Sequence, residues 1–238
     1  MANTYFQFKQ FRVEQEQTAM KVCTDACLFG AWVAREEQQN QRQRILDIGT
    51  GTGLLSLMLA QQVGGAITAI DLDAGAVQQA ASNFQQSPWK ERLQVEQADF
   101  NRWANQSFDL IISNPPFFDG DLLSANTREQ QSKHTVSLSF DALLKGINVC
   151  ITETGSAYLL MAARYHEDFC RLIREHGFHI HQLAWVKQTP RHEPFRIMFQ
   201  FSKKVPEMRI EDTLVIRDND QAYTPEFRSL LTDYYLAF

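Results

Sequence analysis

The chain has 238 residues, 44% hydrophobic and 21% charged, which is enough to bury a substantial core. The formal net charge of −5 argues against a surface that binds nucleic acid everywhere, but it allows a local basic patch. No apolar run could span a bilayer, and residues 1–8 lack the basic and apolar regions of a signal peptide, so we expect a cytoplasmic protein.

The predicted elements begin with a partly helical, lid-like segment over residues 1–40. Apolar strand patterns then alternate with helical patterns, which predicts a largely parallel sheet covered by helices on both faces. The predicted strands are 44–48, 66–71, 93–97, 108–113, 156–162, 179–187 and 195–201. The predicted helices are 54–62, 74–86, 139–150 and 165–176, with a weak helical turn at 100–105.

The last two predicted strands have no helical pattern between them, so we expect an antiparallel hairpin at the edge of the sheet. Near the end, Thr224 and Pro225 are typical of a helix start. We therefore predict a single domain over 1–238, with the lid-like segment at 1–40, the core sheet at 41–205 and a C-terminal helical tail at 206–238.

A glycine-rich turn follows the first of these strands. Gly49, Gly51 and Gly53 allow positive φ and close approach of a ligand to the backbone. A dinucleotide-binding turn would have a small residue where this chain has Leu54, and Asp47 would repel a pyrophosphate. S-adenosylmethionine has no phosphate and carries an ammonium and a sulfonium group, so the turn favours this cofactor.

Three further acidic residues follow the next strands. Asp71 ends the second strand about twenty residues after the glycines, where a carboxylate can accept both ribose hydroxyls. Asp73 is the weaker candidate for the same role. Asp99 follows the third strand and is placed to bind the adenine amino group of the cofactor, with a turn-forming role as the alternative.

An Asn-Pro-Pro-Phe motif follows the fourth strand. An amino group on an aromatic base is a weak nucleophile, because its lone pair is delocalised into the ring. The side-chain oxygen of Asn114 and the carbonyl of Pro115 could accept its two N–H groups, and Phe117 could stack on a base that has left its own stack. The motif therefore predicts methylation of an adenine amino group, with a simple Asn-Pro turn as the alternative.

No metal site is predicted. The cysteines are widely spread, with no second pair of cysteines or histidines at zinc-ligand spacing, so we interpret them as buried thiols. They are Cys23, Cys27, Cys150 and Cys170.

With both motifs in place, the chain resembles the class I methyltransferases of the Asn-Pro-Pro-aromatic type, and within them the bacterial tRNA1(Val) adenine-N6 methyltransferases. The resemblance covers nearly the whole chain, from Phe6, Phe8 and Phe11 through residues 20–26 to 223–227. It implies an α/β Rossmann-like fold with a seven-stranded, mostly parallel sheet and an antiparallel final strand.

The resemblance also implies a function. Members of this family methylate the adenosine 3′ of the anticodon in a valine tRNA, and their Thr-Asp element lies near the methionine end of S-adenosylmethionine. That implicates Thr24 and, less firmly, Asp25. Relatives usually have glycine where this chain has Cys23, which leaves the local backbone shape open.

A tRNA substrate needs cations at the protein surface. The candidate phosphate contacts lie after the Asn-Pro-Pro-Phe motif and in the predicted hairpin, and each could equally be a solvated charge. They are Arg128, Lys133, His134, Arg191, His192 and Arg196.

Other readings remain open. A glutamine methyltransferase acting on a release factor faces the same planar nitrogen, and ribosomal RNA or DNA could supply the amine. A nicotinamide oxidoreductase is opposed by Asp47 and Leu54. The sequence does not fix the oligomeric state, and it allows a monomer.

Overall fold

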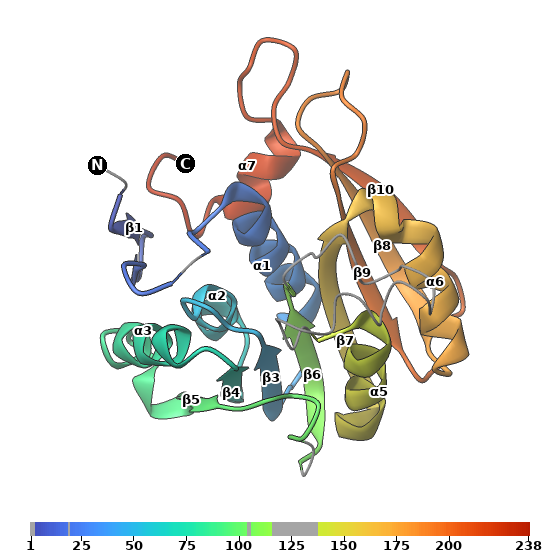
Figure 1. The fold of residues 1–238 in the computed structure, drawn as a ribbon. Helices are drawn as coiled ribbons and strands as arrows, with labels where there is room; N and C mark the ends of the chain where they lie inside the picture. The colour runs from blue at the N-terminus through green and yellow to red at the C-terminus, as the bar shows by residue number, and fades with distance from the viewer. Residues whose placement is uncertain (1–2, 19, 104–105, 116–137) are drawn as a thin grey trace, which may run out of the picture.

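The computed structural model describes residues 3–18, 20–103, 106–115 and 138–238. Its centre is an eight-stranded sheet (Figure 1). In chain order the strands are β3 (Arg44–Ile48), β4 (Ala66–Asp71), β5 (Leu93–Gln97), β6 (Phe108–Ser113), β7 (Ile151–Ala162), β8 (His179–Lys187), β9 (Arg196–Ser202) and β10 (Ile210–Val215). Their spatial order is β10-β8-β9-β7-β6-β3-β4-β5, and β9 is antiparallel to both of its neighbours.

Helices cover both faces of this sheet. They are α1 (Thr24–Glu37), α2 (Leu54–Gln62), α3 (Ala74–Gln85), α5 (Phe140–Cys150), α6 (His166–Glu175) and α7 (Pro225–Leu231). Two short 3-10 helices, η1 (Lys90–Arg92) and η2 (Ala163–Tyr165), connect elements. Helices α1, α2 and α7 lie on one face, and α5 and α6 lie on the other. None of the helices in the described part of the chain is long and apolar enough to cross a membrane.

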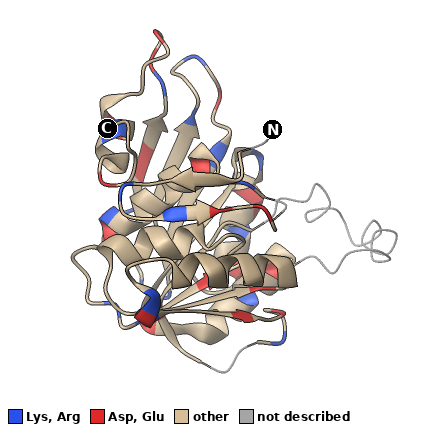
Figure 2. Cartoon of the chain, turned by 90° about the vertical axis from the view of Figure 1, so that its left-hand side faces the viewer, with Lys and Arg blue, Asp and Glu red and all other residues tan. Residues whose placement is uncertain are grey.

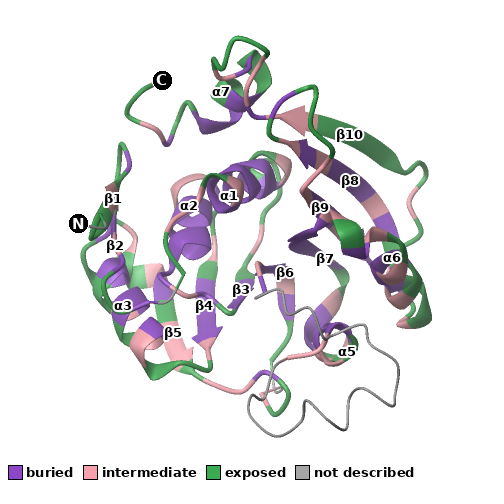
Figure 3. Cartoon of the chain, turned by 45° about the horizontal axis from the view of Figure 1, so that its top comes forward, coloured by how far each residue is buried: buried purple, intermediate pink, exposed green. Residues whose placement is uncertain are grey.

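The interior strands β3, β4 and β6 form because they are apolar on both faces, as buried parallel strands usually are. Successive residues of β3 show this pattern: Ile45 packs among the residues under α1 and α2, whereas Leu46 packs among those under α5 and α6. Both side chains are fully buried. Figure 3 shows the buried residues gathered between the helices and the sheet.

A small two-stranded sheet, β1 (Tyr5–Gln7) and β2 (Arg12–Glu14), precedes the main fold. It is fastened to α3 by Asn83, whose amide nitrogen donates to the carbonyls of Glu14 and Thr52 and whose oxygen accepts the backbone N–H of Glu14. Because Asn83 also reaches the glycine turn, the N-terminal segment and that turn share one anchor.

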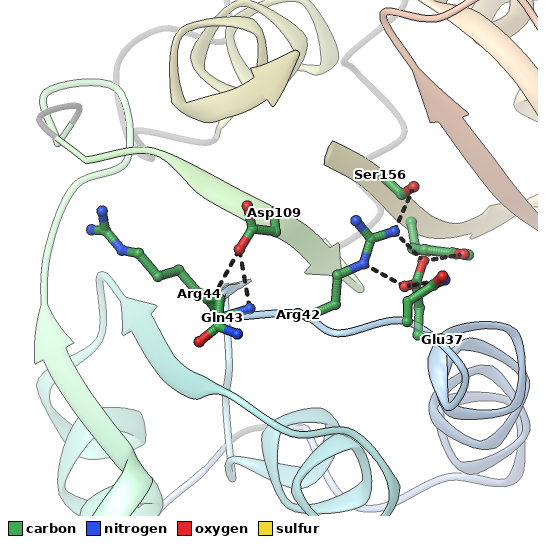
Figure 4. Close-up of polar contacts among 8 residues, drawn as sticks. Glu37, Arg42, Gln43, Arg44, Asp109 and Ser156 are labelled. Carbon is green, nitrogen blue, oxygen red and sulfur yellow. Dashed lines mark hydrogen bonds and ion pairs between the residues drawn. The ribbon is translucent and has the colours of Figure 1, made fainter. Parts of the chain in front are cut away.

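The end of α1 is joined to the start of β3 by a buried ionic network (Figure 4). Glu37 is fully buried, and its carboxylate accepts hydrogen bonds from Arg42 Nε at 2.6 Å and from the hydroxyl of Tyr158 at 2.8 Å. Arg42 also donates to the hydroxyl of Ser156 on β7. A buried carboxylate needs such partners, so the network fixes the chain where it enters the sheet.

Asp109 makes the neighbouring contact. Its carboxylate accepts the backbone N–H groups of Gln43 and Arg44, both at 3.1 Å (Figure 4). Asp109 therefore has a structural role at the start of β6. Both interactions lie at the edge of the sheet where the parallel strands begin, and neither involves the edge where these strands end.

The predicted fold is confirmed, with one addition. The antiparallel hairpin is β8 and β9, but β10 pairs in parallel with β8 and forms the outer edge, so the sheet has eight strands and continues beyond residue 205. The weak turn expected near 100–105 occurs in its described part, because residues 100–102 form a turn with hydrogen bonds between residues three apart.

Candidate functional site

Both sequence motifs lie at the edge of the sheet where its parallel strands end. The glycine turn joins β3 to α2, and Asn114 directly follows β6. Strands β3 and β6 are neighbours, with Ile48 opposite Ser113, and the Ser113 hydroxyl donates to the Ile48 carbonyl at 2.7 Å. Parallel α/β sheets bind their ligands at this edge.

A pocket opens between the two motifs. Its walls are residues 20–23 before α1, Ala26 on α1, residues 49–52 of the glycine turn, Leu54 and Leu55 at the start of α2, and Asn114. The predicted cofactor turn and the predicted acceptor motif therefore face one space.

The glycine turn has the backbone that its sequence predicts. Gly49, Gly51 and Gly53 have φ of 70°, 57° and 81°, values that residues with a side chain rarely adopt. A Cβ built on Gly49 or Gly51 would meet no atom within 4 Å, so open space lies above these two residues. The missing side chains form a cradle that a ligand can enter.

Gly53 has a different reason to be glycine. A Cβ there would lie 2.5 Å from Cε1 of Phe84 on α3, so the turn must pass against an aromatic ring without a side chain. Gly53 does not line the pocket. In the structure, Gly53 allows the turn to pack against Phe84. Its contact with a cofactor stays a prediction.

Asp71 holds the turn from the neighbouring strand. Its Oδ2 accepts the backbone N–H of Gly51 at 2.8 Å, and its Oδ1 accepts that of Asp73 at 3.0 Å. Asp73 itself caps α3 by accepting the N–H of Ala76 at 2.9 Å. A carboxylate has about four acceptor positions, so Asp71 keeps capacity for ribose hydroxyls, whereas Asp73 is committed to its helix.

Asp47 lies beneath the turn and not in the pocket wall. It is fully buried, and its Oδ2 accepts the hydroxyls of Thr50 and Ser56, both at 2.7 Å. Its Oδ1 has no hydrogen-bond partner within the part of the chain that the structure describes. Burial raises the pKa of this carboxyl to about 6.

Three other predicted cofactor residues, Asp71, Thr24 and Asp99, also lie outside the pocket wall. Thr24 is the first residue of α1, and it is exposed. Asp99 is half-buried after β5, and its carboxylate accepts the backbone and side-chain N–H groups of Asn101, both at 3.0 Å. This is the turn-forming arrangement named as its alternative role. The cofactor contacts of all three residues stay predictions.

The acceptor motif is described through Pro115. Asn114 lines the pocket, and its Oδ1 is buried with no hydrogen-bond partner among the described residues. Pro115 is buried beside it. Phe117, the expected stacking residue, lies outside the described residues. A buried acceptor without a donor is destabilising, so this oxygen is suited to a donor on a ligand.

Residues 20–23 form a wall that the motifs did not reveal. Val22 is held there because its backbone N–H donates to Oε1 of Gln15 at 2.8 Å. Cys23 is the N-cap of α1 but makes no side-chain cap bond, so it leaves the first-turn N–H groups to other partners. Burial, the charge of Asp25 and a hydrogen bond to it raise the pKa of the Cys23 thiol to about 12. The only sequence signal for this wall was the resemblance over residues 20–26.

These features fit S-adenosylmethionine. The glycine cradle is open, and no phosphate-binding cation lies in the turn itself. Below and beside it lie the buried oxygens of Asp47 and Asn114 that have no hydrogen-bond partner among the residues the structure describes. We found no group of three or more metal-binding side chains among the residues that the structure describes.

Comparison with known proteins places this site in context. Residues 31–137 match the family model described as Methyltransferase small domain. The chain is 38% identical over 240 residues to the tRNA1(Val) (adenine(37)-N6)-methyltransferase of Cytophaga hutchinsonii, covering 99% of both chains. It is 39% identical over 236 residues to the enzyme of the same name from Cronobacter sakazakii, covering 97% of this chain and 94% of that one.

Solved structures share the fold at low identity. A predicted O-methyltransferase from Agrobacterium tumefaciens superposes with a TM-score of 0.69 at 16% identity, covering 88% of this chain and 96% of that chain. A glycopeptide N-methyltransferase in complex with S-adenosylmethionine superposes with a TM-score of 0.55 at 11% identity, covering 74% and 87%. These similarities concern the fold.

Proposed function

The chain belongs to the tRNA1(Val) (adenine(37)-N6)-methyltransferase family, and from this premise we propose that it methylates N6 of an adenosine in tRNA. The target that we propose is adenosine 37 of tRNA1(Val), next to the anticodon on its 3′ side. The cofactor of this methyltransferase is S-adenosylmethionine.

One observation supports the proposal more than any other: Asn114 and the glycine turn line the same pocket. An amine held by Asn114 would therefore lie beside a cofactor held by the turn. Proximity of two bound reactants supplies much of the rate of a direct transfer.

S-adenosylmethionine, when bound, supplies a methyl group on a positively charged sulfur. The protein's part is to hold the amine in line with it. The Asn114 side-chain oxygen and the Pro115 carbonyl accept the two N–H groups of the adenine. This polarisation stabilises the positive charge that develops on nitrogen.

The described pocket wall contains no carboxylate and no imidazole, so we assign no general base to it. The proton leaves the nitrogen for water after transfer. Phe117 remains our candidate for stacking on the flipped base.

The cofactor is held by backbone more than by side chains. We propose that Gly49 and Gly51 let it approach the turn and that Asp71 accepts its ribose hydroxyls. Asp47 supports the turn from below, and Gly53 lets the turn pass against Phe84. Thr24 and Asp99 keep their proposed contacts at the methionine and adenine ends.

The substrate can be tested directly. Purified protein is incubated with labelled S-adenosylmethionine and unmodified tRNA1(Val), and the digested nucleosides are analysed by mass spectrometry. We expect N6-methyladenosine, and we expect none from the same tRNA carrying guanosine at position 37. Labelling of a release factor in place of tRNA would refute the proposal in favour of glutamine methylation.

We further propose that residues 1–238 act as a single domain and that the enzyme works in the cytoplasm on its tRNA. Basic and acidic residues are interspersed along the chain in the view of Figure 2, and neither charge dominates it. We propose that RNA binding depends on a limited set of cations near the pocket.

A further inference from the structure

Arg196 lies at the same edge of the sheet as the pocket. It is the first residue of β9, opposite Ala162 at the end of β7 and Val186 near the end of β8. Its Nε lies 2.7 Å from Oδ2 of Asp25, in an ion pair whose side chains are 27% and 13% exposed. A short, charge-assisted contact with this little exposure is stronger than an ordinary surface pair.

Asp25 connects this ion pair to the pocket. It is in the first turn of α1, where the helix dipole favours a negative charge. Its neighbours Cys23 and Ala26 both line the pocket, and burial and the negative charge of Asp25 both raise the pKa of the Cys23 thiol. Any movement of Asp25 therefore moves the wall of the pocket on the side of α1.

Arg196 and Asp25 are 171 positions apart in the sequence, so their ion pair is a direct link from the far half of the sheet to this wall. Arg196 had been a candidate for contact with RNA phosphate. The structure instead gives its guanidinium a carboxylate partner inside the protein.

We propose that Arg196 is a positioning residue for methyl transfer, which holds the first turn of α1 against the cofactor pocket through Asp25. The inference rests on the proposed function, since it concerns the same site. Arg196 touches none of the reacting atoms in this role. Its contribution is the alignment of Cys23, Ala26 and the first-turn N–H groups with the glycine turn.

The test compares Arg196→Gln, Arg196→Lys and Asp25→Asn. Isothermal calorimetry measures the dissociation constant for S-adenosylmethionine, and steady-state kinetics measure KM for tRNA. For Arg196→Gln we expect the cofactor dissociation constant to rise about tenfold, which corresponds to about 1.4 kcal/mol, with KM for tRNA unchanged.

The other variants separate positioning from a general loss of structure. Asp25→Asn should repeat the effect, the double variant should be no worse than the weaker-binding single variant, and Arg196→Lys should bind the cofactor better than Arg196→Gln. Arg209→Gln is the matched control, because it removes an arginine that is ion-paired to Glu211 beside β10 and does not line the pocket. It should leave the cofactor dissociation constant unchanged.

An Arg196→Gln protein with wild-type cofactor affinity would overturn the inference. So would a rise in KM for tRNA without a change in cofactor affinity, since that result assigns Arg196 to the RNA. Cofactor calorimetry needs no RNA, so a failure to methylate tRNA would refute the proposed substrate and leave this result standing.

Discussion

We assign Asn114 to binding of the acceptor amine and not to binding of the cofactor, so a substitution there should affect catalysis and cofactor affinity differently. Its side-chain oxygen is the acceptor that we assign to the adenine amino group, and it has no partner among the described residues. We expect Asn114→Ala to lower kcat by about a hundredfold to a thousandfold, as the loss of one charge-stabilising group does. The cofactor dissociation constant should stay near the wild-type value.

Single-turnover methylation of tRNA and cofactor calorimetry measure these two quantities separately. Asn148→Ala is the control. Asn148 lies on α5, away from the pocket wall, and its side-chain amide donates a hydrogen bond to the carbonyl of His176. If Asn114→Ala lost cofactor affinity in proportion to its rate, the assignment of Asn114 to the acceptor would be wrong.

Asp47 predicts a pH dependence of stability. Burial raises its pKa from 3.8 to about 6, so the folded protein binds a proton more readily than the unfolded chain. The stabilisation from that proton is complete below pH 3.8 and is lost as the pH rises through 6. Asp47→Asn cannot ionise, so it should gain stability relative to wild type between pH 4.5 and 7.5, by about 2 to 3 kcal/mol.

Urea unfolding of both proteins without cofactor at several pH values measures this difference. Other titrating groups are common to both proteins and cancel in the comparison. A difference in unfolding free energy that stays constant across this range would show that Asp47 is already ionised at the lower pH.

These residues also show which parts of the site the sequence predicts and which it does not. The types and positions of Asn114, Gly49 and Gly51 carry chemical information by themselves, and the structure brings them to one pocket. Asp47 is buried under the turn with Ser56 as a hydrogen-bond partner, which a strand-and-turn pattern does not reveal. Whether an acid lies in a pocket or beneath it is decided by packing across elements.

At the scale of the elements, the turn between β3 and α2 predicts two different results for two glycines. Gly51→Ala meets open space, so it should strain the backbone by about 1 kcal/mol and place a methyl group where we expect the cofactor. Gly53→Ala adds a close contact with Phe84 to the same kind of strain. It should therefore cost more stability, about 2 to 4 kcal/mol.

Thermal unfolding and cofactor calorimetry on both variants test this division. The expected pattern is that Gly51→Ala loses more cofactor affinity and Gly53→Ala loses more stability. The reverse pattern would mean that the cofactor approaches the turn nearer to Phe84.

The elements themselves differ in how far the sequence predicts them. Strands β3, β4, β5, β6 and β8 occur at the predicted positions. The interior parallel strands β3, β4 and β6 are runs of apolar residues, which makes them the easiest to predict. Strand β10 was not predicted. Its residues are exposed or half-buried, with Glu211 and Asp212 near its centre, so it lacks the apolar signal of a strand. Pairing with β8 stabilises it. Such pairing depends on the path that the chain takes through the whole fold, and a local sequence pattern does not reveal that path.

At the scale of the whole molecule, the fold gathers the ends of β6, β7 and β8 at one edge with the pocket. Two cations lie at this edge of the sheet, Lys187 at the end of β8 and Arg191 in the loop before β9. Neither side chain has a hydrogen bond or ion pair with the residues that the structure describes, and Arg191 is exposed. His192 is hydrogen-bonded to Thr189, and Arg196 to Asp25. The other three candidates, Arg128, Lys133 and His134, lie outside the described residues.

We therefore expect Lys187 and Arg191 to contact tRNA phosphates. Removing both charges, as Lys187→Gln with Arg191→Gln, should raise KM for tRNA by about tenfold and reduce its salt dependence, because two fewer counterions are displaced on binding. Cofactor affinity should not change. Methylation rates over a series of tRNA and salt concentrations measure both effects.

The same change in net charge can be made at the opposite edge of the sheet. Lys90 precedes β5 and Lys204 follows the antiparallel β9, so both are exposed where the parallel strands begin. Lys90→Gln with Lys204→Gln should leave KM for tRNA and its salt dependence near wild type. If both double variants raised KM equally, tRNA would be attracted by the overall charge of the protein, and the edge that carries Asn114 would have no special part in holding it.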